Sequence, residues 1–208
     1  MDETIDSAIL ARESVRLGLV ADTHVPDRVG RLHPALVPAL RAAGVDVIIH
    51  LGDICERGVL ETLQELAPVL AVRGNRDWAS RTKLPKMLSV EIHGKVCVFL
   101  HGHGGFGMYL RGKVWHALEG YQLERHLAYF RQAFQQADVI AFGHTHVPEN
   151  IREDGKLIFN PGSASVPWCR DEPPGYGVIE ISRNGEVAAC HNPLTGFTLK
   201  RKRWCAST

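Results

Sequence analysis

The sequence predicts an α/β fold in which two mixed β-sheets pack face to face as a sandwich, with helices on the outside. In the first half of the chain, short and nearly continuous apolar runs alternate with helix-like segments, as buried parallel strands joined by helices do. In the second half, pairs of strand-like runs follow one another across short polar turns, which indicates hairpins. One open sheet accounts for the first pattern only, so we expect two sheets.

Composition indicates one globular domain over residues 1–208, with an N-terminal extension at 1–14 and a basic tail at 200–208. The extension carries four acidic residues and only a short apolar patch, which is typical of neither a signal peptide nor a membrane span. We therefore expect a cytoplasmic protein without a membrane partner. The basic tail is expected to be a solvated edge strand or a frayed end.

The charge balance bears on the partners of the protein. The chain has 24 basic and 23 acidic residues, a formal net charge of +1, so it lacks the overall positive charge with which proteins attract nucleic acid. A nucleic-acid partner is therefore not expected. Five isolated cysteines without a Cys-x-x-Cys pair indicate neither a disulfide framework nor a thiolate zinc site. The sequence leaves self-association as a homo-oligomer open.

The first apolar run, residues 15–21, is a candidate central strand that ends at Asp22-Thr23-His24. A plain turn capped by Asp22 explains this end equally well when it is taken alone. A helix is expected over residues 33–44, because a proline follows its first residue and a glycine ends it.

Two further apolar runs end in the same way, each with a polar side chain directly after a glycine. Residues 45–51 lead to Asp53, and, after a helix expected at 58–66, residues 69–72 lead to Asn75. Glycine permits a tight turn at such a position, and a Gly-Asn pair is by itself a common turn. The repetition along three successive strands is what favours a shared site.

The alternation of strands and helices is interrupted at residues 88–92 and 96–100, which form a predicted hairpin whose second strand ends at His101. Residues 102–120 are rich in glycine and aromatic side chains, and we expect them to form a loop that faces a substrate or another subunit. A helix with an apolar, core-facing side is predicted over 122–136.

A fifth buried strand, residues 138–141, ends at His144 and His146, and two predicted hairpins at 150–159 and 176–191 follow. Two imidazoles on alternate residues are consistent with a solvated turn or with a metal site. Parallel strands place their carboxyl ends at one edge of a sheet, where α/β proteins position their chemistry.

The five strand ends together supply oxygen and imidazole donors without a thiolate, a set that suits borderline divalent ions such as manganese, iron, nickel or zinc. Seven donors exceed one tetrahedral site, so two ions that share a bridging carboxylate is the economical arrangement, with Asp53 as the bridge. The seven candidate ligands are Asp22, His24, Asp53, Asn75, His101, His144 and His146.

These blocks, Asp-x-His, Gly-Asp, Gly-Asn-x-Asp, His and Gly-His-x-His, resemble in content and order those of the calcineurin-like metallophosphoesterase superfamily, over roughly Val15 to Ser163. The short chain and the His101-Gly102-His103 block resemble its small YfcE-like phosphodiesterase branch. The resemblance implies a four-layer αββα fold. It also implies hydrolysis of small phosphodiesters by in-line attack of a hydroxide that bridges two divalent ions, with manganese expected first.

The resemblance further implies how the seven ligands divide between the two ions, with Asp53 shared. One ion would be held by Asp22, His24, Asp53 and His146. The other would be held by Asp53, Asn75, His101 and His144.

The chain departs from the superfamily pattern at Arg76, where many members have a histidine that can protonate the leaving oxygen. Arginine stays charged, so we expect Arg76 to stabilise charge or to point away, and Asp77 to orient the loop. His103 is then the candidate acid, and a hydrogen-bonded loop histidine is its alternative role.

Two other functions compete with the phosphodiesterase. A retromer subunit shares the implied fold and acts mainly as a scaffold, so the chain could be a metal-binding scaffold or interaction module with little turnover. A nuclease is the other alternative, and it requires a continuous basic path that the near-neutral charge does not favour.

Overall fold

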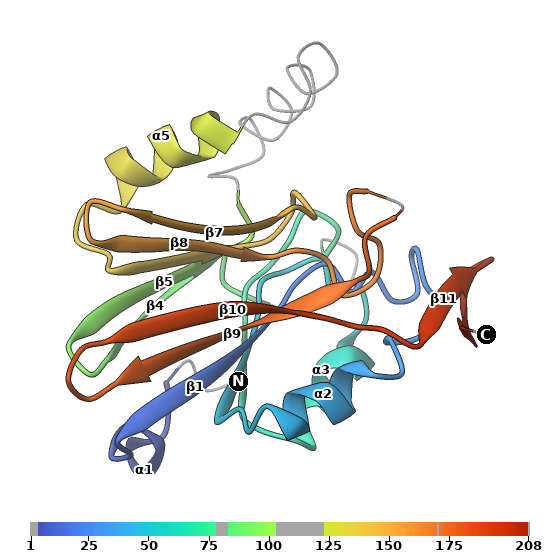
Figure 1. Cartoon of the computed structure of the whole chain (residues 1–208), viewed down its shortest axis with the longest axis horizontal. Helices are drawn as coiled ribbons and strands as arrows, with labels where there is room; N and C mark the ends of the chain where they lie inside the picture. The colour runs from blue at the N-terminus through green and yellow to red at the C-terminus, as the bar shows by residue number, and fades with distance from the viewer. Residues whose placement is uncertain (1–3, 78–82, 103–122, 170, 208) are drawn as a thin grey trace.

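The computed structural model describes residues 4–77, 83–102, 123–169 and 171–207 (Figure 1). Within these ranges the chain forms two five-stranded mixed sheets, in the orders β10-β9-β1-β2-β3 and β4-β5-β6-β8-β7, together with a small two-stranded sheet of β11 and β12. The predicted α/β fold with two mixed sheets is confirmed. The predicted loop at 102–120 lies, beyond Gly102, outside the described residues.

The boundaries of the elements follow the predicted runs closely. The first sheet consists of β1 (Ser14–Val20), β2 (Val47–His50), β3 (Val69–Ala71), β9 (Gly175–Ser182) and β10 (Val187–Pro193). The second consists of β4 (Met87–Ile92), β5 (Lys95–Leu100), β6 (Val139–Phe142), β7 (Pro148–Glu153) and β8 (Lys156–Pro161). The remaining elements are α1 (Ser7–Leu10), α2 (Leu36–Ala42), α3 (Arg57–Gln64), α5 (Leu123–Ala133), β11 (Phe197–Lys200) and β12 (Arg203–Ala206).

The layers are held together by three apolar clusters. The inner cluster lies between the sheets and joins side chains of β1 and β2 to those of β5, β6 and β8, with Leu19, Phe99 and Phe159 fully buried. A second cluster packs α2 and α3 on the outer face of the first sheet, and a third packs α5 on the outer face of the second. Figure 1 shows these helices on opposite sides of the sandwich. Burial of both faces explains why the central strands read as continuous apolar runs.

The topology brings the carboxyl ends of the strands together. In the first sheet β1, β2 and β3 are parallel neighbours, and in the second β5, β6 and β8 are parallel neighbours. Antiparallel pairing is found where the sequence predicts hairpins, at β4 with β5, β7 with β8, and β9 with β10. Every predicted polar strand end therefore belongs to one of the parallel groups.

The basic tail is an ordered part of the fold rather than a frayed end. Residues 203–206 form β12, which pairs with β11 in an antiparallel hairpin. Trp204 is only 6% exposed, because its ring packs on His33 at a centroid distance of 4.4 Å and its indole N–H donates to the carbonyl of Arg31. The charged residues around it face solvent, as expected for an edge strand. No helix in the described ranges is long and apolar enough to cross a bilayer.

The contact of His33 with this hairpin predicts a loss of stability in mild acid. Burial lowers the pKa of His33 to about 4, and its Nδ1 accepts a hydrogen bond from the N–H of Ala35, which a proton on Nδ1 would break. The unfolded chain takes up this proton near pH 6.5, so stability falls as the pH drops from about 6.5 to about 4. We expect a His33→Phe variant to lose less unfolding free energy than the wild type between pH 7 and pH 5, by on the order of 1 kcal/mol.

Urea titrations with a chelator present would measure this difference without a contribution from metal loss. An equal loss in both proteins would show that His33 is not the group responsible.

Candidate metal centre

All seven predicted ligands lie within four residues of the carboxyl end of a parallel strand, and the structure brings them together at one end of the sandwich. The first sheet supplies the ligands that follow β1, β2 and β3, and the second sheet supplies those that follow β5 and β6. The site therefore lies where the two sheets meet. The full set of ligands therefore requires both sheets.

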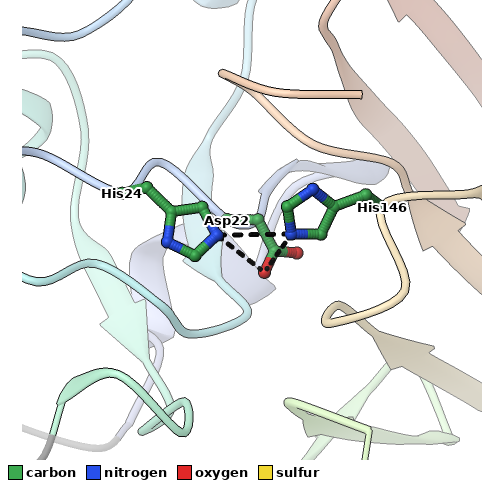
Figure 2. Close-up of side chains that lie close together, drawn as sticks. All are labelled: Asp22, His24 and His146. Atoms are coloured by element: carbon green, nitrogen blue, oxygen red, sulfur yellow. Dashed lines mark hydrogen bonds and ion pairs between the residues drawn. The ribbon is translucent and has the colours of Figure 1, made fainter. Parts of the chain in front are cut away.

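One group of ligand atoms is formed by Asp22, His24 and His146 (Figure 2). The Nε2 atoms of the two histidines are 3.2 Å apart, and Oδ1 of Asp22 lies 3.3 Å from Nε2 of His146 and 3.7 Å from Nε2 of His24. Oδ1 of Asp22 is buried and has no hydrogen-bond partner among the described residues. A buried carboxylate oxygen without a partner is costly, and a cation at this point would satisfy it.

The second group is centred on Asp53 and His101. Nε2 of His101 lies 3.3 Å from Oδ1 of Asp53 and 3.1 Å from Oδ1 of Asn75. The other oxygen of Asp53, Oδ2, lies 3.8 Å from Nε2 of His24 in the first group. Asp53 thus faces a ligand nitrogen in each group, as a bridging carboxylate would.

His144 joins this cluster through its ring and its backbone. Its ring packs edge to face against His101 with centroids 5.0 Å apart, and its N–H donates to Oδ2 of Asp22 at 2.9 Å. All seven predicted ligands are therefore neighbours, although the sequence separates the first and last of them by more than a hundred residues.

The imidazoles are oriented by the ring atom that faces away from the cluster. Nδ1 of His101 lies 2.7 Å from the carbonyl of Leu51, and Nδ1 of His146 bonds the carbonyl of Val166. A carbonyl only accepts, so each Nδ1 carries a hydrogen, and Nε2 is left as the atom that can give up its proton and bind a metal.

The protonation states fit a cation site. Burial raises the pKa of Asp53, but the charge of His101 and its hydrogen bond outweigh this and lower it to about 2. Burial also raises the pKa of Asp22, and attraction by His146 reverses the shift, so both carboxylates are ionised at neutral pH. Burial lowers the pKa of His101, yet the charge of Asp53 raises it to about 9. A metal ion would take the place of this proton.

The backbone of the site is bent in ways that few residues tolerate. Asp22, His24, Asp53, His144 and His146 all have φ between 49° and 74°, the left-handed region. Such strain is concentrated at functional sites, where the surrounding structure holds it. Gly74 is required by close approach, because a Cβ there would lie 2.2 Å from the backbone nitrogen of Asp53. The Gly-Asn block is therefore more than a simple turn.

Asp77 orients the loops through its carboxylate. Its Oδ1 accepts from the N–H groups of Ile54 and Cys55, and its Oδ2 accepts from those of Asp53 and Gly74, at 2.7–3.0 Å. The side chain is buried, and burial is the main reason that its pKa is raised. Asp77 thus ties the loop after β2 to the loop after β3.

Arg76 contacts the site mainly through its backbone. Its N–H donates to Oδ1 of Asp53 at 2.8 Å, while its guanidinium bonds Oδ2 of Asp27 at 2.6 Å. In this structure the side chain is therefore paired with an acid. His103, the predicted proton donor, lies outside the described residues.

Several supporting residues escape prediction from sequence. Asn160 is fully buried and donates to the carbonyl of Gly143 and the hydroxyl of Thr145, and the hydroxyls of Ser163 and Ser165 donate to the carbonyl of Asp22. The available signal is the set of polar residues at the end of β8 and just after it, since β8 is another strand of the parallel group.

Arg28 also escapes prediction. It is half-buried. Burial lowers the pKa of His24 to about 4 against the charges of Asp22 and Asp53, and the charges of His146 and, to a smaller extent, Arg28 add to the lowering. Arg28 therefore contributes a positive charge close to the cluster.

The fold and site define a class of protein, a four-layer α/β sandwich with a cluster of carboxylate and imidazole ligands at its strand ends. Residues 15–184 match the calcineurin-like phosphoesterase superfamily domain. A probable metallophosphoesterase of Methanocaldococcus jannaschii is 34% identical over 180 residues, 86% of this chain and 81% of that protein. This chain therefore belongs to the calcineurin-like phosphoesterase superfamily.

Two further comparisons concern activity and fold. A phosphodiesterase of the same organism is 26% identical over 164 residues, 71% of this chain and 83% of the relative. The vacuolar protein sorting 29 structure from Cryptosporidium parvum superimposes with a TM-score of 0.65 at 18% identity, over 88% of this chain and all of that one. The second likeness concerns the fold alone.

Proposed function

We propose that this protein is a phosphodiesterase that uses two divalent metal ions to hydrolyse small phosphodiesters. The observation that carries the proposal is the position of Asp53, whose two oxygens lie 3.3 Å and 3.8 Å from ligand nitrogens of the two groups. The phosphodiesterase relative supports the same reaction class. Manganese is proposed first, with iron, nickel and zinc as alternatives, because the donors are oxygens and imidazoles.

The two ions, when bound, would supply a nucleophile from water near neutral pH and neutralise the phosphate during in-line displacement. The residues of the chain would hold them as two sets that share Asp53. Asp22, His24 and His146 complete one set, and Asn75, His101 and His144 complete the other. Arg28 would attract the anionic substrate.

His103 is proposed to protonate the leaving oxygen, since Arg76 stays charged. The cytoplasmic location and the single-domain organisation are part of the same proposal. Scaffolding with little turnover is the competing function. The unpartnered oxygen of Asp22 and the aligned Nε2 atoms support metal binding, which both functions share, and the phosphodiesterase relative favours hydrolysis.

Substrate charge provides the test of this function. A monoester carries an extra negative charge, and Arg76, one cation that could meet it, is paired with Asp27. We therefore expect diesters to be hydrolysed faster than matched monoesters, by roughly three- to tenfold. The measurement is a screen of paired mono- and diesters after loading with manganese, nickel or zinc and elemental analysis of the protein.

Monoesters that outpace their matched diesters with every active metal would contradict the phosphodiesterase. Bound metal without hydrolysis of any ester would instead support the scaffold.

A further inference from the structure

The carboxylate of Asp27 lies between a metal-ligand candidate and the arginine of the Gly-Asn block. Its Oδ2 accepts a hydrogen bond from Nη1 of Arg76 at 2.6 Å and lies 3.8 Å from Nδ1 of His24. Nε2 of His24 faces the cluster, so Nδ1 is the atom through which the protein can orient this ring. The contact of Asp27 with Nδ1 is a charge contact at 3.8 Å rather than a hydrogen bond, and Sγ of Cys55 lies 4.0 Å from the same nitrogen. Partners behind a ligating histidine fix its tautomer and direction, and the carboxylate of Asp27 is placed to act in this way through its charge.

The C-terminal hairpin holds the segment that carries Asp27, residues 25–31. Nζ of Lys202 donates to the carbonyl of Asp27 at 2.6 Å, and the carbonyl of Lys202 accepts from the N–H of Gly30 at 2.8 Å. The indole N–H of Trp204 donates to the carbonyl of Arg31 at 2.9 Å. Figure 1 shows this hairpin at the end of the molecule, beside the segment that follows β1. Three bonds thus connect the C-terminus to one short segment at the metal centre.

The same acid belongs to a third group of candidate metal ligands, with His24 and Cys55. One observation argues against an ion there. Oδ2 of Asp27 is already engaged by the guanidinium of Arg76. The group is better explained as support for His24 than as a further metal site.

We propose that Asp27 is a positioning residue of the metal centre, which orients the imidazole of His24 and holds Arg76, and that the C-terminal hairpin keeps Asp27 in place. This inference deepens the proposed function and rests on its metal binding, but not on the identity of the ester. Removing a partner behind a metal ligand typically weakens metal affinity by about 10- to 100-fold. Asp27 is expected to fall within that range.

The test compares Asp27→Asn with Asp154→Asn, an exposed acid in the turn between β7 and β8 where asparagine suits the positive φ of 49°. Manganese affinity is measured by titration, and folding by thermal unfolding with a chelator present. We expect Asp27→Asn to bind manganese at least about tenfold more weakly while its thermal midpoint stays near that of the wild type. Equal affinities of Asp27→Asn and wild type, or an equal loss in both variants, would overturn the proposal.

The contribution of the hairpin is tested with Lys202→Met against Lys200→Met, an exposed lysine of the same hairpin. Lys202→Met should weaken manganese binding several-fold and Lys200→Met should not. Equal manganese affinities of the two variants would contradict the proposal that the hairpin keeps Asp27 in place.

If metal affinity changes as expected but neither wild type nor variant hydrolyses any ester, the positioning role of Asp27 stands and the phosphodiesterase proposal fails. In an active enzyme, Asp27→Asn should lower kcat more than it raises KM, because the change weakens the ion pair that holds Arg76 and leaves the guanidinium free to bind the substrate.

Discussion

Asp53→Asn is expected to abolish stable binding of both metal ions and to lower the rate of diester hydrolysis by roughly a thousandfold, equivalent to about 4 kcal/mol of activation free energy. The two oxygens of Asp53 face His101 at 3.3 Å and His24 at 3.8 Å, so a neutral side chain removes charge from both groups of ligands at once. Asparagine keeps the size of the side chain, and its oxygen can still accept from the N–H of Arg76. The fold should therefore survive.

Asn75→Ala is the matched control, because it removes one neutral donor, whose Oδ1 lies 3.1 Å from Nε2 of His101. It should release one ion and leave the other. Elemental analysis of dialysed proteins measures both outcomes. A single ion in the saturated wild type, or the same metal content in both variants, would contradict the bridging role of Asp53.

Asp77→Asn is expected to have the largest effect on stability, a loss of about 3 kcal/mol in the free energy of unfolding. Each oxygen of this buried carboxylate accepts two backbone N–H groups. An amide replaces one oxygen by an NH₂ group, which would face two donors and leave them without a partner. Metal affinity should fall as well, because the four N–H groups belong to the loops that carry Asp53 and Asn75.

Asp138→Asn provides a comparison, since Asp138 is half-buried and accepts one backbone N–H, from Val96, at a distance from the ligand cluster. It should cost about 1 kcal/mol without a change in metal affinity. Urea unfolding with a chelator measures stability, and titration with manganese measures binding. Equal losses of unfolding free energy in the two variants would contradict a larger contribution from the four hydrogen bonds to Asp77.

The pattern of strands could be predicted because it is a local property of the chain. A strand covered on both faces requires an apolar residue at nearly every position, as in residues 47–50 and 139–142, and a short polar turn between two such runs indicates a hairpin. The polar residues after parallel neighbours of one sheet, such as Asp22 and Asp53, could then be assigned to one site, because such strands end at the same edge. The approach of His144, which follows a strand of the second sheet, depends on how the two sheets pack. Such a pattern does not determine which metal ions the protein binds or which ester it hydrolyses.

The tertiary structure alone decided which side chains support these ligands. The bond from Arg76 to Asp27 joins residues 49 positions apart, and that from Lys202 to Asp27 joins residues 175 positions apart. No periodic pattern in the sequence predicts either contact, since each depends on how separate elements pack against one another. The basic tail is charged enough to suggest a solvated end, yet Trp204 is buried because α2 and its preceding segment offer it an apolar surface. Local sequence determines strands and their ends, whereas long-range packing determines what holds the ligands in place.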